Sequence, residues 1–251
     1  MKKGSMMSDK KLAVLTGAAG GLGVAASRAL GKTGVKVVLT DMAADKAEAA
    51  AAALRTEGID ALGVGLNVTD CAAVDRFITE LVKTDGRLNI LVNLAGVVRN
   101  DYFTKVKNED FDLTFASHVK GTMYCMRAAL PIMRAQKYGR IINMSSIASR
   151  GALGGTSYSA AKGAIEAMSR TAAIESAAKG ITVNCVAPGM IAAGMFLTTP
   201  TQFQDASIAR TPMKRAGTPE EVAHCIAFFA SPEASFVTGQ TLFICGGLSI
   251  G

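Results

Sequence analysis

The sequence predicts an α/β fold in which about seven parallel strands form a doubly wound sheet with helices on both faces. Three observations support this fold class. Short β-rich segments alternate with helical segments along the chain, the links between them are short, and most β-rich segments are apolar without an alternating pattern. Parallel strands that are covered on both faces have this continuous apolar character.

The predicted strands follow one another at intervals that leave room for helices. In chain order they are "LAVLTG" (12–17), "KVVLTD" (36–41), "ALGVGLNV" (61–68), "LNILVNLAG" (88–96), "RIINMSS" (140–146), "ITVNCVAPG" (181–189) and "TLFICGG" (241–247). The clearest helices are 24–34, 45–58 and 220–231. The alanine run 49–53 belongs to the second of these, because alanine has the highest helix propensity.

Composition limits the functions open to the chain. The net charge is +7, but four of the lysines stand among the first eleven residues, no basic stripe follows, and there is no Trp for base stacking. We therefore expect no nucleic-acid partner. No apolar run reaches the ~18 residues of a membrane span, and none follows the N-terminal lysines, so we expect a cytoplasmic protein without a membrane partner. The five cysteines are odd in number and form no C-x-x-C pair, which argues against a disulfide framework or a metal site and favours a reducing compartment.

No linker rich in Pro or Ser divides the chain. Residues 11–251 are therefore expected to form one domain. Residues 1–10 are expected to be a flexible tail, in which Gly-Ser-Met resembles an expression scar.

A glycine-rich turn, "TGAAGGLG" (16–23), follows the first strand and opens a helix. Gly17, Gly21 and Gly23, with Leu22 between the last two, permit a tight turn whose backbone N–H groups can approach a pyrophosphate at the helix N-terminus. The order strand, turn, helix favours a Rossmann-type dinucleotide site over an ordinary turn.

An acidic residue, Asp41, ends the second strand. A carboxylate at this position can accept hydrogen bonds from an adenosine ribose and would repel a 2′-phosphate. Its neighbours Thr40, Met42 and Ala43 are uncharged, so the sequence predicts NAD rather than NADP. The alternative is that Asp41 only caps the next helix.

Four further motifs resemble those of the short-chain dehydrogenase/reductase family. They are "LNVTD" (66–70), "NLAG" (93–96), the Y-x-x-x-K pair Tyr158 and Lys162, and "VAPGMI" (186–191). The resemblance extends from about residue 10 to the C-terminus, and it departs from the family pattern at Asn67, where Asp is usual, and at Leu94, where a second Asn is usual. It implies cofactor contacts from Asn67 and Val68, from Asn93, Ala95 and Gly96, and from Pro188, Gly189 and Ile191.

Tyr158 and Lys162 are four residues apart and therefore share one helix face. A nearby ammonium lowers the pKa of a phenol, which would let tyrosine act as a general acid and base. The resemblance implies that Lys162 also holds the nicotinamide ribose. The alternative for any such pair is a solvated helix surface.

Two adjacent serines compete for the role of the catalytic serine. The usual family spacing of thirteen residues before the tyrosine selects Ser145, whereas strand register, counted from Asn143, selects Ser146. A one-residue slip turns a strand side chain to the other face, while loops tolerate deletions. We therefore choose Ser146 to position the substrate oxygen and keep Ser145 as the alternative.

Two positions depart from the family at the predicted site. His118 stands where many members have an asparagine of the proton relay, and imidazole can donate and accept in such a relay. The alternative is a packed or surface histidine. The same substitution occurs in (3R)-hydroxyacyl-CoA dehydrogenase modules, which implies a thioester substrate. Ala193 replaces a threonine that bonds the nicotinamide carboxamide, so weaker cofactor binding is expected.

Together these features predict an NAD-dependent oxidoreductase that transfers hydride between a secondary alcohol or ketone and nicotinamide. The expected substrate is a 3-hydroxyacyl or 3-oxoacyl thioester of CoA or a carrier protein. The alternatives are a dehydrogenase of cyclic or steroid alcohols and a dinucleotide-binding sensor without turnover. The resemblance also implies a homotetramer, built from the helices in "FDLTFASHVKGTMYCMRAAL" (111–130) and "YSAAKGAIEAMSRTAAIE" (158–175).

Overall fold

Seven parallel strands form one sheet in the computed structural model of the chain, which describes residues 10–250. The predicted tail therefore lies outside the described residues, apart from Lys10. The strands are β1 (Leu12–Thr16), β2 (Lys36–Asp41), β3 (Ala61–Gly65), β4 (Ile90–Asn93), β5 (Gly139–Met144), β6 (Ile181–Pro188) and β7 (Thr241–Ile244). Their order across the sheet is β3-β2-β1-β4-β5-β6-β7, so the predicted doubly wound sheet is confirmed.

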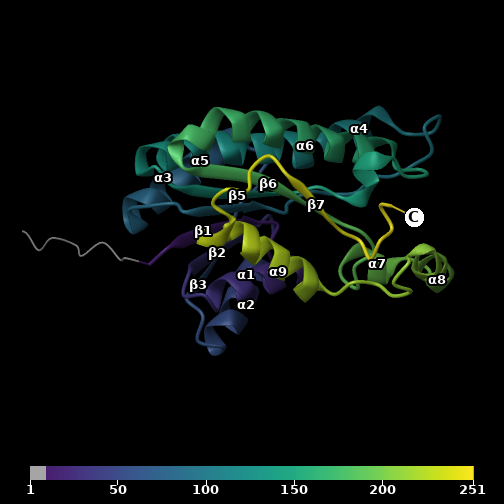
Figure 1. Cartoon of the computed structure of the whole chain (residues 1–251), viewed down its shortest axis with the longest axis horizontal. Coiled ribbons are helices and arrows are strands. Elements are labelled where there is room, and N and C mark those ends of the chain that lie inside the picture. Colours follow the sequence, from purple (N-terminus) through teal and green to yellow (C-terminus); the bar gives the residue numbers. More distant parts are fainter. Residues whose placement is uncertain (1–9, 251) are drawn as a thin grey trace, which may run out of the picture.

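Helices cover both faces of the sheet (Figure 1). One face carries α1 (Gly21–Gly31), α2 (Ala44–Thr56) and α9 (Pro219–Ala230), and the other carries α3 (Cys71–Asp85), α5 (Gly121–Gln136) and α6 (Thr156–Ser176). The shorter elements are α4 (Asn108–Phe115), the π-helical turn η1 (Ala116–Lys120), the 3₁₀ turns η2 (Ile147–Arg150), η3 (Ala177–Lys179) and η4 (Pro232–Ala234), α7 (Met195–Thr198) and α8 (Thr201–Arg210). Among the described residues, no helix is both long and apolar enough to cross a membrane.

Two apolar cores lie on the two faces of the sheet. Successive residues of β1 point to opposite faces, and accordingly Leu15 belongs to the core under α1 and α9, while Val14 belongs to the core under α3 and α5. Every residue of β1, β4, β5 and β6 is buried. The continuous apolar character of these segments is thus explained by burial on both faces.

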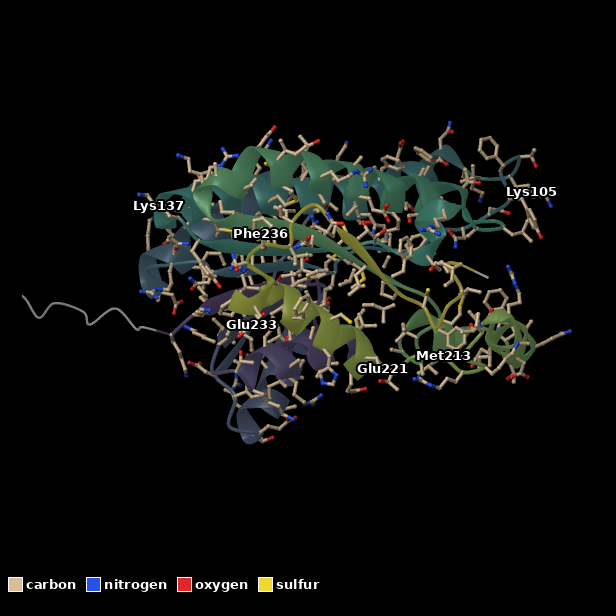
Figure 2. All side chains as sticks on the ribbon, viewed as in Figure 1. Lys105, Lys137, Met213, Glu221, Glu233 and Phe236 are labelled. Carbon is tan, nitrogen blue, oxygen red and sulfur yellow. The ribbon has the colours of Figure 1, made fainter. Side chains whose placement is uncertain are left out.

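The carboxyl ends of the strands meet at one edge of the sheet. Lys137, just before β5 begins, lies at the opposite end of the molecule from Lys105 and Met213, and α7 and α8 lie at the carboxyl edge (Figures 1 and 2). Several predicted strands end earlier than expected, because the glycines and polar residues that follow leave the sheet ladder and turn along this edge. Chain order reverses between β1 and β4, and ligands of doubly wound sheets bind at such a reversal.

Candidate active site

The glycine-rich turn between β1 and α1 is shaped by close contacts that exclude side chains. Gly17 has φ +63°, and a Cβ there would lie 2.6 Å from the Cα of Ala95. A Cβ on Gly23 would overlap the Cα of Ala18. These two glycines let the turn after β1 pack against both the segment after β4 and its own helix.

The first turn of α1 is open toward the cleft. Its N-cap is Gly20, which supplies no side-chain cap, and no acidic residue stands in the first turn. Nothing lies within 4 Å of a Cβ built on Gly20, and the nearest group to one on Gly21 is the Cβ of Ala193 at 3.7 Å. Leu22 follows and is partly buried against the core. Helix N–H groups without side-chain caps and without a nearby carboxylate can bind an anion such as a pyrophosphate.

Asp41 lies at the end of β2 and joins two segments beside this turn. Its carboxylate accepts a hydrogen bond from the backbone N–H of Ala43 at 3.2 Å and a longer one from that of Ala19 at 3.4 Å. It therefore joins the residue before α2 to the glycine-rich turn, but it is not the cap of α2, whose N-cap Ala43 has no side-chain cap hydrogen bond. Met42 beside it is exposed. The carboxylate is partly exposed and keeps lone pairs for a further donor.

The residues after β3 and β4 differ in how they can meet a ligand. Asn67 is exposed, but its side-chain oxygen already accepts from the N–H and hydroxyl of Thr69. Val68 is buried and packs against Gly121. Asn93 is buried and donates to the side chain of Asn143 at 2.8 Å, so it joins β4 to β5 behind the cleft.

Ala95 and Gly96 lie where the chain leaves β4. The backbone N–H of Ala95 donates to the hydroxyl of Thr16 at 3.3 Å, which ties this segment to the end of β1. A Cβ on Gly96 would overlap the imidazole ring of His118. Both residues keep the backbone close to its neighbours, and the cofactor contacts expected of them stay a prediction.

Tyr158 and Lys162 do not form a solvated surface pair. Lys162 is 1% exposed and donates to the backbone carbonyl of Met144 at 2.7 Å. Its ammonium nitrogen lies 5.3 Å from the centre of the Tyr158 ring. A fully buried lysine has to be held by polar partners, and this one is held at the end of β5.

Burial changes the acidity of both groups. It lowers the pKa of Lys162 to about 7, because the charged ammonium loses its hydration. It raises the pKa of Tyr158, and a hydrogen bond with Ser146 opposes this effect. The sequence-based expectation that Lys162 lowers the pKa of Tyr158 is therefore wrong for the protein alone, because burial of the phenol is the larger effect.

The two serines face different residues of α6. The Ser146 hydroxyl accepts a hydrogen bond from the N–H of Ala148 at 3.1 Å and is bonded to Tyr158. Ser145 is 1% exposed, and its hydroxyl donates to the carboxylate of Glu166 at 2.6 Å. Of the two, Ser146 thus lies with Tyr158 and Lys162, while Ser145 is turned to another part of the helix.

His118 joins this group from the π-helical turn η1. It is 3% exposed, its Nε2 lies 2.8 Å from the carbonyl oxygen of Val97, and its ring centre lies 5.3 Å from that of Tyr158 in an edge-on arrangement. Burial, together with the charge of Lys162, lowers the pKa of His118 to about 3. The ring is therefore neutral near pH 7, and Nε2 must carry the proton because its partner is a carbonyl.

The second ring nitrogen of His118 has no partner in the described part of the chain. Nδ1 is buried and, in this tautomer, is an acceptor. A buried acceptor without a donor costs ~1–3 kcal/mol, so a ligand hydroxyl or a water molecule that donates to it would be favoured. Its burial excludes a surface histidine, while the packed histidine stays the alternative.

The turn after β6 closes the other side of the cleft. Pro188 ends β6, and a Cβ on Gly189 would lie 2.8 Å from the Cβ of Cys245. Ile191 pairs with Gly217 in an isolated bridge. Ala193 then leads into α7 and α8, which occupy the segment beyond the turn.

Sequence reasoning missed several polar residues behind the site. Asn143 donates to Ser169 at 2.8 Å, and Cys185 lies 3.1 Å from the same hydroxyl. Glu166 was also missed. Its position four residues after Lys162 was the available signal, because that spacing places it on the face of α6 that carries Tyr158 and Lys162.

Comparisons with known proteins agree with this fold and cover the whole site. A family model described as Enoyl-(Acyl carrier protein) reductase matches residues 17–249. The (2S)-((R)-hydroxy(phenyl)methyl)succinyl-CoA dehydrogenase subunit BbsD of Thauera aromatica is 37% identical over 242 residues, which are 96% of this chain and 98% of that protein. The 3-oxoacyl-(acyl-carrier-protein) reductase FabG of Staphylococcus aureus (strain N315) is 34% identical over 244 residues, 96% of this chain and 99% of that one. The crystal structure of gox2181 matches with a TM-score of 0.93 at 30% identity, over 97% of each chain.

Proposed function

The chain belongs to the short-chain dehydrogenase/reductase family and is an oxidoreductase, and we propose that it interconverts a secondary alcohol and a ketone with NAD as its cofactor. The observation that carries this proposal is the convergence of Ser146, Tyr158, Lys162 and His118 at the carboxyl edge of the sheet. These groups come from three segments that are distant in sequence, and they meet where doubly wound sheets bind their ligands.

Ser146 and Tyr158 handle the substrate oxygen in this proposal. The Ser146 hydroxyl accepts from the N–H of Ala148, which leaves its own proton free to donate. It can hold the substrate oxygen beside Tyr158, whose hydroxyl then exchanges the proton of the alcohol. The raised pKa keeps Tyr158 protonated near neutral pH, so it is available to donate a proton in ketone reduction, although it is a weaker acid than a free tyrosine. A positive charge brought near the phenol would lower this pKa.

Lys162 and His118 continue the proton path away from Tyr158. A lysine with a pKa of about 7 can take up or release a proton near neutral pH. His118 Nδ1 is an acceptor in this tautomer, and in this proposal a water molecule that donates to it continues the path. His118 itself stays neutral, because its pKa of about 3 is far below the working pH.

The fit of NAD rests on the cleft above β1 and β2. The open first turn of α1 suits the pyrophosphate, and Gly17 and Gly96 let the segments after β1 and β4 pack closely beside it. Asp41 suits a ribose diol, while a 2′-phosphate would meet its negative charge. When bound, NAD supplies the carbon that accepts hydride from the alcohol.

A 3-hydroxyacyl or 3-oxoacyl thioester is the substrate class that we propose. The names of BbsD and FabG give a CoA thioester and a carrier-protein thioester, respectively. Both relatives cover nearly the whole chain. We also propose a homotetramer in the cytoplasm, with α5 and α6 at the subunit interfaces, which gel filtration with light scattering would test.

Near-ultraviolet absorbance of the reduced cofactor tests the proposal. We would offer NAD and NADP separately, with each enantiomer of 3-hydroxybutyryl-CoA and with simple cyclic alcohols. Turnover of one thioester enantiomer with NAD is expected. Turnover of cyclic alcohols alone would contradict the proposed thioester substrate. A preference for NADP would contradict the role assigned to Asp41.

A pair of tyrosine variants separates an enzyme from a dinucleotide-binding sensor. Tyr158→Phe should reduce turnover by about 10²–10⁴-fold and leave NADH binding within about twofold, because it removes only the acid–base hydroxyl. Tyr138→Phe is the matched control, since Tyr138 stacks on Arg140 at the amino end of β5. Binding of NADH without any turnover in the parent protein would favour the sensor.

A further inference from the structure

The end of β5 is tied to one face of α6 at four successive positions. Asn143 donates to Ser169, the carbonyl of Met144 accepts from Lys162, Ser145 donates to Glu166, and Ser146 lies close enough to Tyr158 to lower the pKa of its phenol. In Figure 1, α6 lies along one face of the sheet above β5 and β6. Two of these contacts involve the proposed catalytic groups, and the contact of Ser145 with Glu166 lies directly beside them.

Glu166 lies on the same face of α6 as the two proposed catalytic residues of that helix. Tyr158, Lys162 and Glu166 follow at intervals of four residues and therefore share one face of α6. The side chain of Glu166 is 16% exposed, while its nearest cation, Arg170, is 4.0 Å away and 56% exposed. A carboxylate that is this much buried is held mainly by its hydrogen bond from Ser145, at 2.6 Å.

Ser145 is fixed by its backbone as well as by Glu166. Its N–H donates to the carbonyl of Val186 at 2.8 Å, which joins the end of β5 to β6. The peptide that follows leads directly to Ser146, whose conformation is extended and whose carbonyl accepts from the N–H of Ser149. Ser145 is thus the last residue held by the sheet before the chain turns into η2.

We propose that Glu166 is a positioning residue for catalysis: through Ser145 it fixes where β5 ends and thereby aims the Ser146 hydroxyl at Tyr158. This role rests on the proposed function, because it assigns Ser146 and Tyr158 to the reaction. In this role Glu166 acts only through the neighbouring serine, with which it shares its hydrogen bond. Its loss lets the Ser145–Ser146 peptide rotate, which lengthens the contact between Ser146 and Tyr158.

Four variants test this assignment by steady-state kinetics. Glu166→Ala removes the acceptor, Ser145→Ala removes the donor, and the double variant removes both. Each should reduce kcat by about tenfold, the effect of one hydrogen bond lost from the transition state, while the Kd of NADH stays within about twofold. The double variant should be no worse than either single one, because both act through one contact. Glu166→Gln keeps an acceptor oxygen and should restore most of kcat.

Glu175→Ala is the matched control on the same helix. Its side chain is 61% exposed and lies 3.8 Å from Arg134 at the far end of α6, so kcat should not change. Additive losses in the double variant, or a Glu166→Gln enzyme as slow as Glu166→Ala, would overturn the proposal. Full activity in Glu166→Ala would overturn it as well.

Tyrosinate absorbance gives a readout that needs no substrate. The titration curve of Tyr158 is obtained by subtracting the absorbance of the Tyr158→Phe form from that of each protein. The other three of the four tyrosines are present in both forms and cancel. Since the bond with Ser146 lowers the pKa of Tyr158, Glu166→Ala should raise it, and Glu166→Gln should not. An unchanged titration in Glu166→Ala contradicts the positioning role even when the parent enzyme turns over its substrate. If Glu166→Ala raises the pKa of Tyr158 but the parent protein shows no turnover, the result supports the contact of Ser146 with Tyr158 and contradicts only the proposed function.

Discussion

The packing of Gly96 against His118 gives a sharp prediction for stability. Gly96 has no positive φ, so alanine is allowed there by the backbone, but its Cβ would overlap the imidazole and lie 2.6 Å from Nε2. The ring cannot move aside freely, because it is 3% exposed and held by the Val97 carbonyl. Overpacking costs ~1–3 kcal/mol and the loss of the Val97 bond ~0.5–1.5 kcal/mol. We expect Gly96→Ala to lower the free energy of unfolding by about 2–3 kcal/mol, or the Tm by about 5–10 °C.

Far-ultraviolet circular dichroism during thermal and urea unfolding measures this change, since the chain has no Trp to report by fluorescence. The control is Gly163→Ala in α6, where the nearest atom to the new Cβ is 3.9 Å away and stability should be unchanged or up to ~1 kcal/mol higher. In the double variant Gly96→Ala/His118→Ala the clash is absent, so its loss should be about 2 kcal/mol smaller than the sum of the single losses. Additive losses, or a Gly96→Ala protein as stable as its parent, would refute the steric argument.

Three other perturbations follow from the site. Asp41→Arg should shift the ratio of kcat/KM for NAD to that for NADP by about 10²-fold toward NADP, through loss of the ribose acceptor and gain of a phosphate partner; an unchanged ratio contradicts the assigned role. Ala193→Thr should tighten NADH binding by about 2–10-fold, the value of one hydrogen bond, as measured by NADH fluorescence titration, and equal affinity contradicts it. Lys162 has a folded pKa of about 7 against 10.5 unfolded, so between these values the unfolded chain binds more protons and stability rises with pH. Between pH 7 and 8.5 the parent protein should therefore gain about 1.6 kcal/mol relative to Lys162→Met, and parallel pH profiles of urea unfolding would contradict this.

The strands were the most predictable part of the molecule. Apolar runs such as "LAVLT" and "ILVN" are buried on both faces of the sheet. A continuous apolar pattern is what such burial requires, so the pattern alone predicts these strands. Strand ends were less predictable. "NLAG" reads as part of a strand, yet β4 ends at Asn93, because Leu94 and the residues after it bond the end of β1 and pack against His118 instead. These are contacts between distant segments, which local propensity does not encode.

The acidities at the site could not be predicted from spacing alone. A Y-x-x-x-K pair on a helix gives the distance between two side chains but not what covers them. Lys162 lies beneath the end of β5 and is fully buried, so its own pKa falls to about 7 and it does little to lower that of Tyr158. Only the packing of α6 on the sheet decides this, and it depends on residues throughout the core.

The choice between Ser145 and Ser146 depends on two different sequence signals. Counting residues back from Tyr158 crosses the loop 147–155, whose length is free to vary, whereas counting along β5 follows a ladder in which each residue has a fixed partner. Three of the contacts between β5 and α6 depend on the second count only: helix positions 158, 162 and 166 recur every four residues and meet positions 146, 144 and 145, respectively. A residue lost from the loop leaves these contacts in place, because neither the helix spacing nor the strand register changes. By the same reasoning, a buried serine at position 145 requires a hydrogen-bond acceptor at position 166.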